Sequence, residues 1–194
     1  MIKRIETEKD KLKRDKKKQL ILAGILIFVM FGSIFGIVVN SFGNGRQAES
    51  LTYKGFIFLN ENEVYSTPFG NSRFYFSNNP KDADSTTQDV NLEKTLTNYI
   101  GETVYVSSPD VLYFNEISGN LYQYVSEISE ACKDGENCND ETLPKKTCLD
   151  NLIIIKISEM NRIYESSNCV YIEGKEKDLL KLTDKFLLQI IGIK

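Results

Sequence analysis

The chain of 194 residues contains no histidine and no tryptophan. Without histidine it cannot form the Ser-His or Cys-His pairs that activate nucleophiles, and it lacks the commonest general base. The sequence also contains no G-x-x-x-x-G-K-[ST] phosphate loop, no G-x-S-x-G nucleophile elbow and no N-x-[ST] glycosylation acceptor. We therefore expect neither an enzyme nor a bound cofactor, although Ser-Lys or paired-carboxylate catalysis is not excluded by composition alone.

Charge is missing from one long stretch near the N-terminus. From Leu20 to Val39, Ser33 is the only polar side chain, and such a run forms a helix of about 30 Å, the thickness of the hydrocarbon core of a bilayer. We predict a transmembrane helix over residues 20–40. The alternatives are a cleaved signal peptide, which is usually shorter and ends in an A-x-A site, and a pilin-type leader cut near Gln19.

Charge is also distributed unevenly on the two sides of this run. Residues 1–19 contain nine Lys/Arg and four Asp/Glu, whereas residues 41–194 contain fifteen Lys/Arg and twenty-three Asp/Glu. Because basic flanks stay in the cytoplasm, we expect a single-pass signal anchor in the cell membrane, with a cytoplasmic tail of residues 1–19 and the C-terminal part outside. The acidic exterior argues against nucleic acid as a partner. The expected partners are the lipid bilayer and another membrane or envelope protein.

Gly32 and Gly36 form a G-x-x-x-G motif within the predicted span. The two glycines lie one turn apart on one helix face, where two helix backbones can approach closely. This pattern predicts transmembrane packing through Gly32 and Gly36, in a homodimer or with a partner helix. The alternative interpretation is that glycine is simply common in membrane helices.

The part that follows the span has the length and pattern of one folded domain. Residues 41–50 have the composition of a linker, and residues 51–194 are long enough to bury a core. Since strands and helices do not alternate regularly, we expect an α+β domain of antiparallel strands with a few helices. Runs of aromatic and β-branched residues predict strands over 53–59, 63–67, 73–77, 103–107, 151–157 in a central position, 162–166 and 169–174.

Helical spacing of apolar residues predicts three helices. A short one is expected over 91–100, and another follows Asn120 as its N-cap. The chain closes with an amphipathic helix that ends near Gly192, with a row of lysines along a second side. Its apolar stripe is expected to pack in the core rather than on a membrane, and it consists of Leu179, Leu182, Phe186, Leu187, Ile190 and Ile191.

Four cysteines lie in the expected exterior domain: Cys132, Cys138, Cys148 and Cys169. An even number in an exported domain predicts two disulfides, and the spacings differ from the C-x-x-C pairs of most zinc sites. Of three connectivities we favour Cys132–Cys138 with Cys148–Cys169, because the first pair flanks a short polar loop. A four-thiolate zinc site is the alternative. The acidic segment 134–141 lacks the order of a known calcium loop, so we interpret it as solvated and expect no metal.

Three segments, "YKGFIF", "NNP" and "NCVYIEG…DLLKLTDKFLLQIIGI", resemble uncharacterised single-pass membrane proteins of small-genome archaea. The resemblance spans most of residues 50–194 and implies the same topology, but no activity. We therefore expect a membrane-anchored extracytoplasmic interaction or structural module. The alternatives are an extracytoplasmic small-ligand-binding domain that acts with a membrane partner, and a pilin-like subunit.

Overall fold

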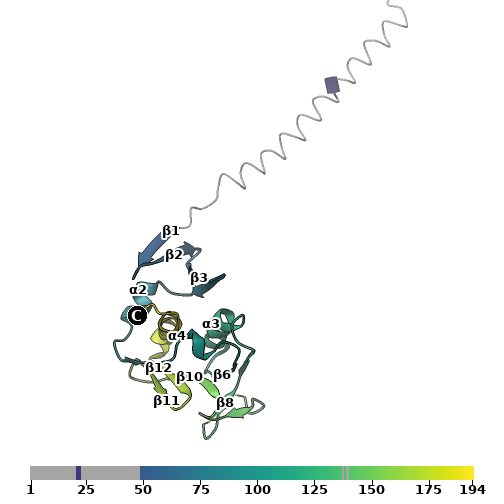
Figure 1. The fold of residues 1–194 in the computed structure, drawn as a ribbon, viewed down its shortest axis with the longest axis vertical. Helices are drawn as coiled ribbons and strands as arrows, with labels where there is room; N and C mark the ends of the chain where they lie inside the picture. The colour runs from purple at the N-terminus through teal and green to yellow at the C-terminus, as the bar shows by residue number, and fades with distance from the viewer. Residues whose placement is uncertain (1–20, 23–48, 137, 139) are drawn as a thin grey trace, which may run out of the picture. The chain divides into compact units, whose positions relative to one another are not determined.

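The fold is shown in Figure 1 as a computed structural model, which divides into two compact units, residues 1–47 and 48–194. The structure describes residues 21–22, 49–136, 138 and 140–194.

The predicted anchor lies almost entirely outside the described residues. Of residues 20–40, the structure describes Ile21 and Leu22, so Gly32 and Gly36 fall outside it, as does the tail of residues 1–19. Among the residues that are described, no helix combines the length and the hydropathy that a membrane span requires. The transmembrane helix and its packing face therefore stay predictions.

The N-terminal part of the domain is an antiparallel meander in the order β1-β2-β3-β4. The expected strand over 53–59 is divided, because Lys54 and Gly55 both adopt positive φ angles, 46° and 83°. Two such residues form the two-residue turn whose twist matches a β-hairpin. The strands of this sheet are β1 (Glu49–Tyr53), β2 (Phe56–Glu61), β3 (Val64–Phe69) and β4 (Ser72–Phe76).

A second, six-stranded sheet has the order β5-β11-β12-β10-β6-β7. The predicted central position of β10 is confirmed, since it pairs with both β12 and β6. The expected antiparallel pairing holds in the meander and between β11 and β12, but the other pairs of this sheet are parallel. Parallel pairing arises where a crossover returns the chain to the same edge, as α3 does between β6 and β7. The strands are β5 (Val90–Asn91), β6 (Thr103–Ser107), β7 (Glu127–Glu130), β10 (Asn151–Ile157), β11 (Arg162–Ser166) and β12 (Cys169–Gly174).

The C-terminal helix α4 (Glu176–Ile190) is the centre of the core. It packs on β12, β10 and β11, while α2 (Pro80–Ser85) and α3 (Val111–Leu121) also contact it. The predicted apolar stripe is confirmed, because all six of its residues are buried. Helix α4 ends as expected before Gly192, whose φ of 87° suits glycine. Of the lysines along the second side of the helix, Lys185 is buried, because α2 packs against it.

Two of the predicted helices differ from the structure. In place of a helix over 91–100, the chain forms a 3₁₀ turn at Leu96–Asn98 after β5. The helix expected to begin after Asn120 instead ends near it, since Asn120 is the last residue but one of α3, and the segment after this helix contains the strand β7. Helix α3 begins after Asp110, whose carboxylate accepts the backbone N–H of Leu112 at 2.8 Å. The sequence does not clearly predict the start of α3, because its first four residues, Val111–Phe114, are all apolar and the weak helix formers Ser118, Gly119 and Asn120 lie near its end.

Asn120 is not an N-cap but a link between α3 and the meander. Its Oδ1 accepts the backbone N–H of Tyr75 at 2.7 Å, and its Nδ2 donates to the Tyr75 carbonyl at 2.8 Å. The side chain therefore pairs with β4 as a neighbouring strand would, at an edge where backbone groups would otherwise lack partners.

Candidate functional site

Both predicted disulfides are present with the favoured pairing. Cys132 is bonded to Cys138 and Cys148 to Cys169, with Cα separations of 5.9 Å and 5.0 Å. They frame a segment that we call the disulfide lobe, residues 131–150, which contains the short parallel strands β8 (Cys132–Lys133) and β9 (Lys145–Lys146). Because Cys169 belongs to β12, the second bond fastens the lobe to the six-stranded sheet. Within the described part of the chain, no group of three or more metal-binding side chains comes together.

The disulfide lobe packs on the face of the sheet that is turned away from α4. Side chains alternate along β10: Ile153 and Ile155 belong to the main core, whereas Leu152 and Ile154 belong to a second, smaller cluster. That cluster contains Ala131 and Cys148 of the lobe together with Cys169, Tyr105 and Tyr171. The lobe is thus anchored by apolar contacts as well as by its covalent bond.

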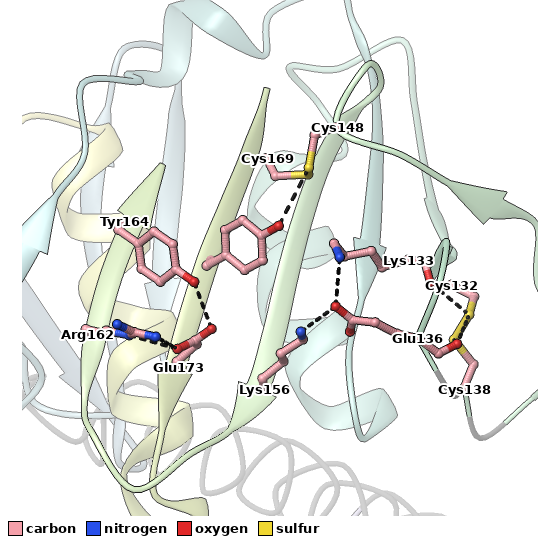
Figure 2. A network of polar contacts seen from close by, with 11 residues as sticks. Cys132, Lys133, Glu136, Cys138, Cys148, Lys156, Arg162, Tyr164, Cys169 and Glu173 are labelled. Atoms are coloured by element: carbon pink, nitrogen blue, oxygen red, sulfur yellow. Dashed lines mark hydrogen bonds and ion pairs between the residues drawn. A yellow bond between two sulfur atoms is a disulfide. The ribbon is translucent and has the colours of Figure 1, made fainter. Parts of the chain in front are cut away.

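Glu136 connects the disulfide lobe to the sheet through charge (Figure 2). Its carboxylate accepts from Lys156 of β10 and from Lys133 of the lobe, the latter at 2.9 Å. Burial opposes the charged form of Glu136, but the hydrogen bonds and the positive charges of Lys156 and Lys133 outweigh it, so its pKa lies below the usual value. The same contacts hold the lobe against the end of β10.

A stack of rings and cations continues along this face of the sheet. The rings of Tyr164 and Tyr171 lie parallel, with centroids 4.8 Å apart, while Arg162 lies over Tyr164 and Lys156 over Tyr171. Glu173 receives two hydrogen bonds from Arg162, at 2.8 Å and 2.6 Å, and one from the Tyr164 hydroxyl at 3.0 Å. Burial and the Glu173 carboxylate raise the pKa of Tyr164 to about 12. Since both outer ring faces already carry a cation, the stack supports the sheet rather than offering a platform for a ligand.

A pocket of about 360 Å³ opens between the disulfide lobe, the start of α3 and the ends of three parallel strands. The strands β6, β7 and β10 all point their carboxyl ends toward it, which is the edge where open sheets with parallel strands bind ligands. We call it the edge pocket, and it is lined by Ser107, Ser108, Pro109, Asp110, Val111, Glu130, Ala131, Glu136, Cys138, Asp140, Leu143, Ile155, Lys156 and Ile157.

The edge pocket combines negative charge with exposed apolar surface. Four carboxylates and a single lysine line it, and the lysine, Lys156, is paired with Glu136. Hydrogen bonds from the hydroxyl and backbone of Thr142 lower the pKa of Asp140 and favour its charged form. At the rim, Val111 and Ile157 are 57% and 58% exposed. Such a lining suits a positively charged group that is joined to an apolar one.

The predicted cysteines thus belong to the site, since Cys138 lines the edge pocket and the two bonds shape the lobe beside it. The carboxylates were not predicted, although "SPD" directly after the strand 103–107 is a polar turn of the kind that often follows a parallel strand at a binding edge. Comparisons of the chain with family models, with curated proteins and with solved structures find no match. The geometry of the edge pocket therefore carries the functional argument.

Proposed function

We propose that this protein is a membrane-anchored extracytoplasmic interaction module that binds another membrane or envelope protein at the edge pocket. The observation that carries the proposal is the pocket itself, a concave, acidic site with an apolar rim at the carboxyl edge of β6, β7 and β10. The anchor is proposed from residues 20–40 and from the basic tail before them, with Gly32 and Gly36 as its packing face.

The partner segment that fits is basic, with an apolar side chain beside its positive charge. Complementary charge steers encounter and suppresses wrong partners, and apolar contact at the rim adds affinity. A catalytic step is not part of the proposal, because groups in the pocket are already engaged: Lys156 with Glu136, and Asp110 with the start of α3.

A small ligand is the second candidate, favoured by the volume of the pocket. About 360 Å³ lies within the range of sites that enclose small molecules. In this case the anchored domain would bind a cationic compound and act with a membrane partner.

Site-specific photo-crosslinking in cells that make the protein tests the proposal. A photoreactive residue at position 111 or 157, on the pocket rim, should give one discrete protein adduct. The same residue at position 100 should give none, although Ile100 is similarly exposed, at 53%. Glu130→Lys should abolish the adduct by reversing a charge in the pocket.

Adducts of equal yield at position 100, or none at positions 111 and 157, would refute the protein partner. A small cation that is retained in native mass spectra of the purified protein, and is lost in Glu130→Lys, would then support the second candidate.

A further inference from the structure

Two acidic side chains from different helices meet at the connection between β4 and α2. Glu116 of α3 accepts hydrogen bonds from the backbone N–H of Ser77 at 3.2 Å and from its hydroxyl at 2.6 Å. Asp184 of α4 accepts from the backbone N–H and the side-chain amide of Asn78, both at 2.8 Å. Because Ser77 and Asn78 are neighbours in the chain, they bring the two carboxyl groups together.

One oxygen of Asp184 has no donor. The side chain is fully buried, and both bonds from Asn78 end on Oδ2, so Oδ1 has no hydrogen-bond partner in the described structure. Glu116 lies within hydrogen-bonding reach of Asp184, yet two ionised carboxylates have no proton with which to form the bond. An unpaired, buried carboxylate oxygen beside a second negative charge strongly disfavours the doubly ionised state.

The cation nearest in sequence does not neutralise the pair. Lys185 follows Asp184 but points toward α2, where its amine contacts the Asp84 and Thr87 carbonyls and lies 3.3 Å from the Asp84 carboxylate. The other charged groups on the elements packed against α4 are exposed or bonded elsewhere: Lys81 and Asp82 at the surface, Asp84 also with Lys54, Lys156 with Glu136, Arg162 with Glu173, and Glu165 with the backbone N–H of Lys94.

We propose that Asp184 and Glu116 share one proton in the folded protein and so form a latch that joins α3 and α4 at the β4–α2 connection until a rise in pH releases it. The proton completes the missing bond, since a protonated carboxyl donates to its neighbour. Burial raises the pKa of Asp184 well above its usual value, the charge and hydrogen bond of Glu116 raise it further, and the bonds from Asn78 oppose this only in part.

The sign of the pH dependence follows from this proton. A carboxyl group loses its proton near pH 4 in the unfolded chain but keeps it to a higher pH in the folded protein. The stability that the latch contributes is therefore complete below about pH 4 and declines as the pH rises through the raised pKa of Asp184. Between the pKa of Asp184 in the unfolded chain and its raised pKa in the folded protein, this one group changes the unfolding equilibrium constant by up to about tenfold per pH unit.

Urea unfolding of the full chain in detergent micelles between pH 4.5 and 9 tests the latch. The unfolding constant of the parent should rise with pH relative to that of Asp184→Asn, by up to about tenfold per unit. Glu116→Gln should flatten the dependence as well, because its amide can donate to an ionised Asp184. Asp82→Asn, an exposed change on α2, should follow the parent. Parallel profiles for the parent and both latch variants would overturn the proposal.

A spectroscopic measurement decides the point even where a variant fails to fold. In the parent protein, labelled with ¹³C at aspartate carboxyl carbons, the resonance of Asp184 should titrate at a higher pH than those of the other aspartates. Glu116→Gln should lower the pH at which Asp184 ionises. The absence of any aspartate resonance that titrates above the others would refute the shared proton.

Discussion

Lys185 shows how single charged residues hold this core together. Only 3% of the side chain is exposed, and its amine donates to the carbonyls of Asp84 and Thr87, at the end of α2. The last carbonyls of a helix have no donors within the helix itself, so a lysine from another element can satisfy them. The carboxylate of Asp84, 3.3 Å away, balances the charge. One side chain thereby fastens α2 to α4.

We expect Lys185→Met to lower the free energy of unfolding by about 3 kcal/mol. Removing one partner of a buried ion pair costs about 3–5 kcal/mol, and the lower end applies because Lys54 still pairs with Asp84. Lys177→Met on the exposed side of the same helix is the matched control and should change stability by less than about 0.5 kcal/mol. Urea unfolding of the full chain in detergent measures both, and equal effects would contradict the role assigned to Lys185.

At the scale of elements, the hydrophobic pattern predicted those strands that are bounded by polar turns. The strands 103–107, 151–157, 162–166 and 169–174 have the expected bounds, because polar residues lie directly on both sides of each run. The hydrophobic pattern did not reveal that the expected strand over 53–59 is divided at Lys54–Gly55. The turn there is set by positive φ angles and not by hydrophobicity.

The sequence also predicts only those parts of the site whose residues lie close together in the chain. The disulfide pairing was predictable because Cys132 and Cys138 flank one short loop. The edge pocket was not, because Asp110 lies after β6 and Glu130 is the last residue of β7, and their approach depends on parallel pairing of these two strands. Likewise, the tie between Asn120 and β4 joins residues that lie 45 positions apart. Contacts of this kind follow from tertiary packing, which no local pattern encodes.

The two disulfides should differ in their contribution to stability. The Cys148–Cys169 bond closes a loop of 21 residues and the Cys132–Cys138 bond one of 6. Loop-closure entropy predicts a cost of about 3 kcal/mol for losing the first and about 2 kcal/mol for losing the second. Burial of Cys169 among Leu152 and Ile154 widens the difference. Paired Cys→Ser variants, compared by urea unfolding, measure it.

Loss of the short bond should act on the edge pocket more than on the fold, because Cys138 lines that pocket. Crosslinking from position 157 should therefore weaken in the Cys132→Ser, Cys138→Ser variant while most of its stability is kept. An unfolding midpoint that drops further for this pair than for Cys148 and Cys169 would contradict the loop-length argument.

At the scale of the whole molecule, the separation of charge agrees with the proposed topology. The first 19 residues carry an excess of five positive charges, and residues 41–194 an excess of eight negative ones. A basic tail favours the cytoplasmic side. An acidic domain that contains two disulfides suits an oxidising exterior, where such bonds persist. The edge pocket would then face partners outside the cell.

Trypsin added to intact cells should test this orientation at one residue. Arg46 is the sole Lys/Arg between the predicted span and residue 53, so cleavage there should release the domain and leave a fragment that contains the tail and the span. An antibody against a tag at the N-terminus detects that fragment, and Arg46→Gln is the matched control, which should slow its appearance.

After permeabilisation, the tag itself should be lost, because the nine cations of the tail become accessible. A mature protein that begins beyond Val39, or a domain that survives in intact cells but is cut at Arg46 after permeabilisation, would refute the proposed anchor.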